Sequence, residues 1–176
     1  VLKHSFIKND IDRFVLAKLK EKMVKPSKRA DPVTLVRRLY FDLTGLPPTT
    51  AQVQAFVEDA SSSAYQELVT ELLAQPQFGE RMAMYWLDVV RYADSNGYHA
   101  DKTRQVSPYR DYVIEAFNSN KSYDEFVREQ IAGDLIPNAT IEQQVASAFN
   151  MLLQTTDEGG AQAKEYLAKY AADRVR

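Results

Sequence analysis

Apolar residues recur three or four positions apart along most of this chain, a spacing that places them on one face of an α-helix. Segments with this spacing begin near residues 10, 32, 50, 64, 77, 108, 123, 141 and 161. No segment alternates apolar and polar residues convincingly, as a half-buried strand does. The pattern therefore predicts an all-α fold, in which 1–176 form a single domain with an irregular array of eight or nine short helices.

Helix-start signals support these boundaries. Asn9 or Asp10 can cap the first helix, and Asp31 is followed by Pro32, the favoured order of a cap and a first helical residue. A Ser or Thr followed three residues later by Gln or Glu forms a capping box. The sequence has four such pairs: Thr49 with Gln52, Ser63 with Gln66, Ser122 with Glu125, and Thr140 with Gln143.

The same spacing predicts which side of each helix faces the core. In the first helix we expect the inward residues to be Ile11, Phe14, Val15, Leu16 and Leu19. A helix over 78–93 has an apolar stripe of Phe78, Met82, Tyr85 or Trp86, Val89, Val90 and Ala93. The helix after Pro108 is expected to bury Tyr109, Tyr112, Val113, Ala116 and Phe117, and the last helix, over 161–174, to dock through Leu167 and Tyr170.

Charge and composition exclude several classes of function. The formal net charge of −2 and the pI near 5.8 argue against a general nucleic-acid binder, which carries a basic excess. No apolar run approaches the roughly 18 residues of a transmembrane helix, so no membrane span is expected. The chain has no cysteine, which removes disulfides, thiolate metal ligands, covalent haem attachment and cysteine nucleophiles.

The segment 79–101 is the richest in ionisable and aromatic residues, and it contains the single tryptophan of the chain. Arg81, Asp88 and Arg91 are seven and three residues apart, so they are expected to share one helical face. Two guanidinium groups around a carboxylate could bind a carboxylate, phosphate or sulfate group. The alternative is an ion-pair network that holds a neighbouring helix in place.

A loop of about 14 residues, 94–107, follows this helix, and long loops in small domains are often functional. Asp94, Asn96 and Asp101 are a weak candidate for a calcium site, with Gly97 between them. An EF-hand loop, however, needs its glycine at the sixth position and a glutamate at the twelfth, and neither is present. We therefore expect no metal here, and interpret Asn96-Gly97 as a turn. His99 alone is no ligand set.

Aromatic residues of this region offer a second interpretation. If Trp86, Tyr92 or Tyr98 surrounds a groove on the surface, a carbohydrate ligand is favoured, since sugar rings stack on aromatic faces. If all three are buried, docking within the protein is favoured instead.

An enzyme acting on polysaccharide is the alternative from a different class. Glycosidases need two carboxyl groups roughly 5–10 Å apart across a cleft. The acid and base would come from Asp88, Asp94 and Asp101. No nucleophile elbow or other motif identifies a catalytic residue, so the sequence leaves the catalytic residues unknown and favours a non-catalytic domain.

Several segments in order closely resemble one family of domains. They are Ile11–Val15, Leu35–Thr49, Phe78–Arg81, Trp86–Asp94 and Tyr109–Val113. They resemble the helical domain of unknown function in the large planctomycete-type cytochrome c-like proteins, from about residue 10 to the end of the chain. Because this family has no established activity, the resemblance assigns no catalytic residue.

The resemblance implies a cellular context. Family members are large exported proteins, so we expect an extracytoplasmic location in the periplasm or cell envelope. Their pattern continues with a Cys-x-x-Cys-His motif for c-type haem downstream of the position of Arg176. We therefore expect 1–176 to be a fragment that stops before this motif, to hold no cofactor itself, and to contact the haem-bearing segment and other domains of its parent protein.

The resulting hypothesis is a non-catalytic binding or scaffolding module, with a polysaccharide as a further candidate ligand. The family's signature segments include Arg81, Trp86, Asp88, Arg91, Asp94 and the pair Tyr109-Arg110, which makes these residues better candidates than other charged or aromatic ones. The complete candidate surface comprises Arg81, Trp86, Asp88, Arg91, Tyr92, Asp94, Tyr98, His99, Asp101, Tyr109 and Arg110.

Overall fold

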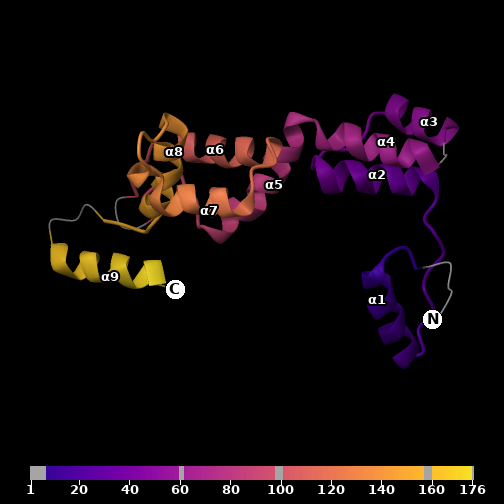
Figure 1. Cartoon of the computed structure of the whole chain (residues 1–176), viewed down its shortest axis with the longest axis horizontal. Coiled ribbons are helices and arrows are strands. Elements are labelled where there is room, and N and C mark those ends of the chain that lie inside the picture. Colours follow the sequence, from indigo (N-terminus) through magenta and orange to yellow (C-terminus); the bar gives the residue numbers. More distant parts are fainter. Residues whose placement is uncertain (1–6, 60–61, 98–100, 157–159, 176) are drawn as a thin grey trace.

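Helices supply nearly all of the regular structure (Figure 1). The computed structural model describes residues 7–59, 62–97, 101–156 and 160–175. Within these ranges lie nine α-helices: α1 (Asp10–Glu21), α2 (Pro32–Leu43), α3 (Thr50–Glu58), α4 (Ser62–Leu73), α5 (Pro76–Val89), α6 (Ser107–Asn118), α7 (Tyr123–Ala132), α8 (Ile141–Ala146) and α9 (Ala163–Val175). Two short 3-10 helices, η1 (Gly133–Leu135) and η2 (Ser147–Met151), flank α8. The prediction of an all-α fold with eight or nine short helices is confirmed.

The helix caps follow the predicted chemistry at most sites. Asn9, Thr49 and Thr140 form reciprocal capping boxes, and Asp31 accepts the backbone N–H of Thr34 ahead of α2. Two of the four predicted boxes are wrong. Ser63 lies inside α4, which starts one residue earlier, so it cannot be the cap. Ser122 is the cap of α7, but its hydroxyl is directed to the Glu125 carboxylate, 3.3 Å away, instead of a backbone N–H.

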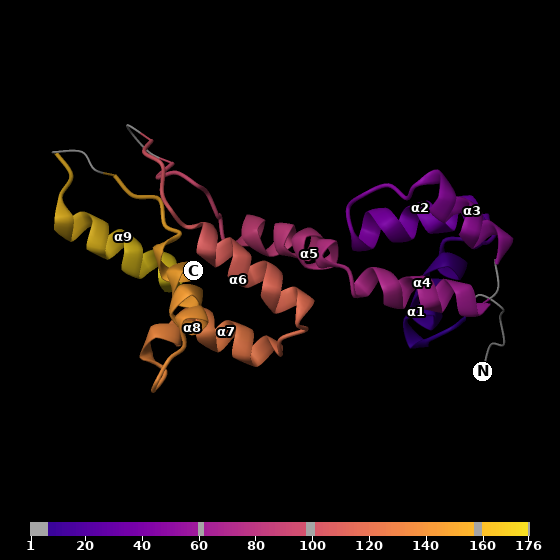
Figure 2. The same cartoon turned by 90° about the horizontal axis from the view of Figure 1, so that it is seen from above.

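The apolar core consists of two clusters along an elongated row of helices (Figure 1, Figure 2). α2, α3 and α4 bury the smaller cluster, which is Val36, Tyr40, Phe56 and Leu72. The larger cluster joins α5 to α8 and η2, and contains Ala83, Val90, Tyr109, Tyr112, Val113, Ala116, Phe126, Ala146 and Leu152. The helix α5 continues from the end of α4 to the side of α6, and so links the two clusters.

The predicted inward face of α6 is confirmed, whereas that of α5 is partly wrong. Tyr85 and Val89 are 56% and 73% exposed, and the buried positions of α5 are Gly79 and Ala83. The cause is the close approach of α6: a β-carbon on Gly79 would lie 2.5 Å from the Ile114 carbonyl oxygen. Gly79 and Ala83 therefore face α6, and Tyr85 and Val89 lie on the exposed side of α5, whereas Trp86 and Leu87 pack against the larger cluster.

The helix α5 also ends earlier than predicted, at Val89 instead of Ala93. Arg91 has a positive φ of 58°, which is incompatible with a continuing helix. From there the chain runs to Ser107 and folds back on itself, with an isolated antiparallel bridge between Ser95 and Thr103.

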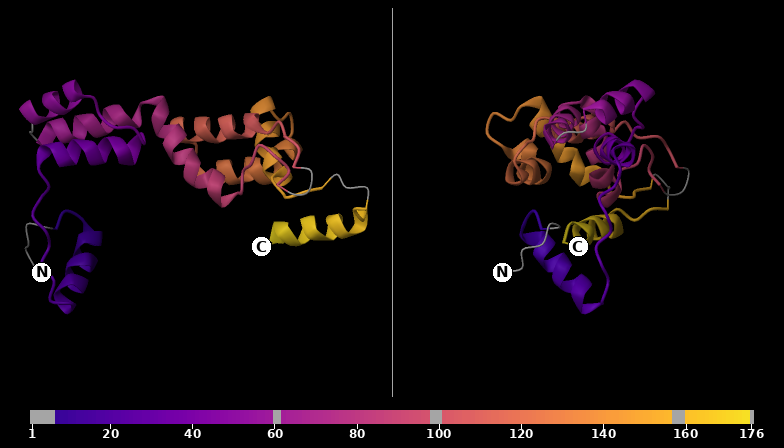
Figure 3. Two further views of the ribbon diagram at one scale, coloured as in Figure 1. Left: turned by 180° about the vertical axis from the view of Figure 1, so that it is seen from behind. Right: turned by 90° about the vertical axis from the view of Figure 1, so that its right-hand side faces the viewer.

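The first and last helices lie on the same side of the row, near opposite ends (Figure 1, Figure 3). In α1, every residue of which is described, Leu16 alone is buried, and Ile11 and Phe14 are 71% and 76% exposed. The predicted inward face of α1 is therefore largely wrong. In α9, Tyr170 is half-buried as expected, but Leu167 is 70% exposed, because contacts are made by the neighbouring face of the helix.

Candidate functional site

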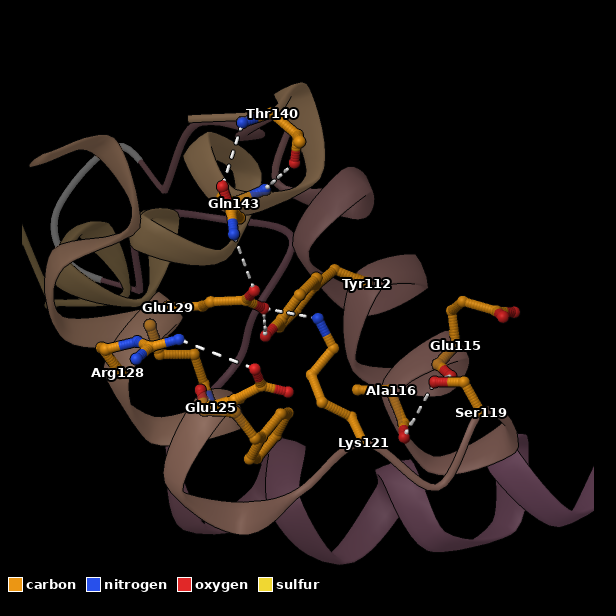
Figure 4. A network of polar contacts seen from close by, with 12 residues as sticks. Tyr112, Glu115, Ala116, Ser119, Lys121, Glu125, Arg128, Glu129, Thr140 and Gln143 are labelled. Atoms are coloured by element: carbon orange, nitrogen blue, oxygen red, sulfur yellow. Dashed lines mark hydrogen bonds and ion pairs between the residues drawn. The ribbon is translucent and has the colours of Figure 1, made fainter. Parts of the chain in front are cut away.

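A buried carboxylate lies between α6, α7 and α8 (Figure 4). Glu129 of α7 is 5% exposed and accepts three hydrogen bonds. The Tyr112 hydroxyl and the Lys121 ammonium donate to its Oε2 atom at 2.8 and 2.5 Å, and Gln143 donates from Nε2 to Oε1 at 3.1 Å. The capping box with Thr140 fixes Gln143 in turn, so this network joins α6, α7 and α8.

The network determines which protonation states its members hold. Burial alone would raise the pKa of Glu129, but hydrogen bonds from Lys121, Tyr112 and Gln143 outweigh burial and lower it below its ordinary value. Burial and the bond to Glu129 raise the pKa of Tyr112. Glu129 is thus ionised and Tyr112 neutral near pH 7, which suits a structural ion pair better than an acid or base poised to exchange protons.

A second network fixes the tryptophan. The indole N–H of Trp86 is shared between Gln130 Oε1 at 2.9 Å and the Tyr109 hydroxyl oxygen at 3.1 Å. The Tyr109 hydroxyl donates to the same Gln130 oxygen at 2.5 Å, and burial raises the pKa of Tyr109 to about 12. Tyr109 is fully buried, so it belongs to the core and not to a binding surface.

The sequence interpretation missed Glu129, Gln130, Lys121 and Gln143. A signal for two of them was present: Glu129 and Gln130 lie three and four residues after Phe126, on the inward face of α7. Polar residues at core positions indicate a buried network. Their hydrogen-bond partners are brought together by the packing of α6 and α8, which the local sequence pattern does not predict.

The carboxylates proposed for metal binding or catalysis hold the 94–104 loop together. The Tyr92 hydroxyl donates to Asp94 Oδ1 at 2.6 Å, and the Gly97 backbone N–H donates to Asp101 Oδ1 at 2.7 Å. Asn96 is buried, and its backbone N–H donates to the Lys102 carbonyl. Together with the bridge between Ser95 and Thr103, these bonds hold residues 94–97 beside residues 101–104.

The loop is also tied to the segment after η2. The Arg104 guanidinium donates to the carbonyl oxygens of Met151 and Leu153, each at 2.9 Å, and to that of Ser95. Bonds from Ser95 and Gly97 lower the pKa of Asp101, so this carboxyl stays ionised near neutral pH and is no general acid. Within the described ranges, no group of three Asp, Glu or His side chains is placed to hold a metal ion.

The structure does not assemble the predicted anion-binding face from Arg81, Asp88 and Arg91. Arg91 lies beyond the end of α5, and its Nη2 atom donates to Asp173 Oδ2 of α9 at 2.7 Å. Arg81 packs against Gly45 in the turn after α2 and lies over the Tyr85 ring, at 5.0 Å from its centroid.

Asp88 is exposed, and in the described part of the chain no ion pair joins it to either arginine. The Nε atom of Arg81 is buried without a hydrogen-bond partner among the described residues. The alternative expected for Arg81, Asp88 and Arg91 was an ion pair with a neighbouring helix. Among the described contacts of these three residues, only Arg91 forms one, with Asp173 of α9.

The remaining candidates do not form one exposed surface. Tyr92 is half-buried, and its ring stacks on Tyr109 with centroids 6.5 Å apart. Burial, followed by the bond from its hydroxyl to Asp94, raises the pKa of Tyr92 to about 12. Arg110 is paired with Asp111 on the surface. Tyr98 and His99, two further candidates, lie outside the described residues.

An apolar groove lies beside these networks, between α5 and α7. One part, of about 490 Å³, is lined by Trp86, Val89, Val90, Tyr123, Val127, Gln130, Ile131, Phe149, Asn150, Leu152 and Leu153, and the paired Arg91 and Asp173 also line it. A second part, of about 310 Å³, is lined by Phe78, Trp86, Ala116, Phe117, Asn120, Lys121, Tyr123 and Phe126. Because Trp86 and Tyr123 line both, we treat them as one feature, the α5–α7 groove.

The resemblance implies c-type haem on a segment downstream of Arg176, and not within 1–176. Thioether attachment needs cysteine, and the sequence has none. Its two histidines, His4 and His99, lie outside the described residues. The described residues therefore supply no attachment site or imidazole ligand for haem.

The structure defines an all-α protein with buried polar networks under an open apolar groove. The chain belongs to the family described as "Protein of unknown function (DUF1549)", with the short name PSCyt2, whose model matches residues 10–176. Neither a curated protein nor a solved structure matches the chain. No helix in the described part is long and apolar enough to cross a membrane.

Proposed function

We propose that this domain is a non-catalytic docking module of a larger exported protein, and that its α5–α7 groove receives an apolar helix from a haem-bearing segment that follows it. The groove carries the proposal. Val89, Tyr123 and Ile131 line it, yet they are 73%, 72% and 60% exposed. Large apolar side chains gathered around a groove are typical of surfaces that other protein segments cover.

The character of the groove favours a peptide segment over a small polar ligand. Small-molecule sites combine apolar walls with a few convergent polar groups. Here the Trp86 indole and the Gln130 amide bond each other, and Arg91 is paired with Asp173. A groove between two helices matches the mode in which a partner helix lays its apolar face between them.

The roles of the carboxylates support a non-catalytic domain. A glycosidase needs two carboxyl groups that face a substrate across a cleft. Asp94 and Asp101 instead accept hydrogen bonds that fold their own loop, and Asp88 lies on the exposed side of α5. No observation favours the polysaccharide-active alternative.

The context of the proposal, an exported protein with c-type haem on a following segment, rests on the sequence resemblance. Because the described residues offer no haem attachment, the haem would be held by the partner segment. The role of this domain would be to position that segment.

The proposal can be tested by titrating this domain into the following segment, produced with its haem attached, and measuring the dissociation constant from the visible absorption band. We expect Val89→Glu combined with Ile131→Glu to weaken binding by about a hundredfold, because two charges would enter an apolar contact. Both side chains are exposed, so the domain should still fold, which circular dichroism checks.

The matched control places the same charges outside the groove. Met84 on α5 and Ile141 on α8 are 59% and 80% exposed and do not line it. Met84→Glu combined with Ile141→Glu should bind as the unchanged protein does. Equal affinity of the groove variant and this control would contradict the proposal.

A further inference from the structure

The segment 8–29, which contains α1, differs in charge from the rest of the protein. It holds eight basic residues against three acidic ones, a net charge of +5, whereas the whole chain carries −2. The basic residues are Lys8, Arg13, Lys18, Lys20, Lys22, Lys25, Lys28 and Arg29. A basic segment on an otherwise acidic molecule favours an anionic partner at this place.

The same segment exposes large apolar side chains. Ile11, Phe14 and Val15 are three and four residues apart, so they share one face of α1, and they are 71%, 76% and 43% exposed. Met23 and Val24, directly after the helix, are 93% and 52% exposed. Lys18 is four residues from Phe14 and three from Val15, so this face of α1 carries cationic as well as apolar side chains.

The acidic residues of α1 are engaged within the segment. Asp10 pairs with Arg13 at 3.0 Å, and Glu21 with Lys18 at 2.8 Å. Asp12 accepts the backbone N–H groups of Lys8 and Asn9 at the helix start. Because two of these contacts also engage Arg13 and Lys18, the net charge of the segment stays at +5.

We propose that residues 8–29 are a peripheral binding element for a membrane surface rich in anionic phospholipid. Helices with exposed Phe and Leu-type side chains lie in the membrane interface, and Lys side chains beside them extend their ammonium groups to anionic headgroups. Nucleic acid would use the charges but leave Phe14 and Ile11 in water.

The position of α1 suits a flat surface better than a groove in another protein. The helix lies at one end of the molecule, set apart from α2, α3 and α4 (Figure 1, Figure 3). Its exposed side is therefore open to a planar surface. This inference is independent of the α5–α7 groove and of the function proposed for it.

The test is sedimentation of the 176-residue chain with vesicles of equal parts phosphatidylglycerol and phosphatidylcholine, compared with phosphatidylcholine alone. We expect binding to the anionic vesicles only, weaker at high salt because the ionic part is screened. Ile11→Ser combined with Phe14→Ser should weaken binding about tenfold, from the loss of apolar contact. Both side chains are exposed, so folding should be unchanged.

The control removes equally exposed apolar side chains elsewhere. Leu135→Ser combined with Ile141→Ser, at positions 77% and 80% exposed, should bind vesicles as the unchanged chain does. Failure to sediment with anionic vesicles, or equal binding by the Ile11/Phe14 variant, would overturn the proposal. Binding to polyglutamate but not to the vesicles would also overturn it, and would assign the segment to an acidic protein partner.

Discussion

At the scale of single residues, Glu129 shows how this protein holds its C-terminal helices in one arrangement. A buried ion pair contributes little net stability compared with an apolar core, but removal of one partner is costly because the other is left uncompensated. Glu129 receives donors from residues 112, 121 and 143, and each comes from a different part of the chain. An alternative packing of α6, α7 and α8 would leave this carboxylate unsatisfied.

We therefore expect Glu129→Gln to lower the free energy of unfolding at pH 7 by about 3 kcal/mol, measured by urea denaturation. Gln lacks the charge that Lys121 pairs with and can no longer accept from all three donors. The control is Glu125→Gln on the same helix, where the side chain is 53% exposed and the ion pair with Arg128 is long, at 3.7 Å. That change should stay within about 0.5 kcal/mol. Equal effects of both substitutions would contradict the role given to Glu129.

The pH dependence follows from the lowered pKa of Glu129. The ionised form stabilises the folded state fully above the ordinary pKa of 4.5, and this contribution is lost as the pH falls through the lower, folded-state pKa. The stability difference between the unchanged protein and Glu129→Gln should therefore be constant from pH 6 to 8, within the range above 4.5, and shrink below 4.5. A difference that persists unchanged in acid would show that charge plays no part.

At the scale of helices, the contact between α5 and α6 determines how the larger cluster packs. Gly79 lies against the α6 backbone, and its N–H donates to Asn118 Oδ1 at 2.7 Å. Ala83 follows one turn later on the same buried face. Small residues at these two positions allow the helices to approach closely.

Gly79→Ala should accordingly destabilise the protein by about 1–3 kcal/mol, although alanine favours a helix by about 1 kcal/mol over glycine. The added β-carbon would lie 2.5 Å from both the Ile114 carbonyl oxygen and the Asn118 side chain. Gly160→Ala is the control, because nothing lies within 4 Å of a β-carbon there. Thermal unfolding of both variants measures the difference. A higher melting temperature for Gly79→Ala would refute close packing at this point.

The sequence predicted helix positions better than helix faces. Local caps such as Asn9, Asp31 and Thr140 mark helix starts because their hydrogen bonds are made within four residues. The inward face of α5 was predicted only in part: Val90 is buried, but Val89 is exposed, and the burial of Gly79 depends on the distance to α6. The face of α1 was also predicted wrongly, because Ile11 and Phe14 are apolar yet have no core beside them.

The candidate site was less predictable than the fold. The sequence drew attention to charged residues in 81–110, and the structure uses many of them for internal bonds, as with Tyr92 to Asp94 and Arg91 to Asp173. The groove is lined from both α5 and α7, which lie about 40 residues apart in the chain. Its existence follows from tertiary packing, so no motif could have indicated it.

At the scale of the whole molecule, the two apolar clusters lie one after the other along an elongated row of helices. This arrangement gives the molecule a large surface area relative to its buried core. The groove lies over the larger cluster, and Trp86 contributes to the buried network with Gln130 as well as to the groove wall. The hydrogen bond to Gln130 thereby helps to fix the position of the Trp86 side chain in the groove wall. A partner helix placed there would add a further apolar layer to α5 and α7.

Trp86 provides the most direct measurement of the central claim, because it is the only tryptophan in the chain and lines both parts of the groove. The emission of Trp86 should be recorded while the following segment, with its own tryptophans replaced by phenylalanine and its haem attached, is titrated in. We expect saturable quenching by the nearby haem, lost in the Val89→Glu/Ile131→Glu variant. Emission that stays constant while the visible band reports binding would place the contact elsewhere and contradict the account.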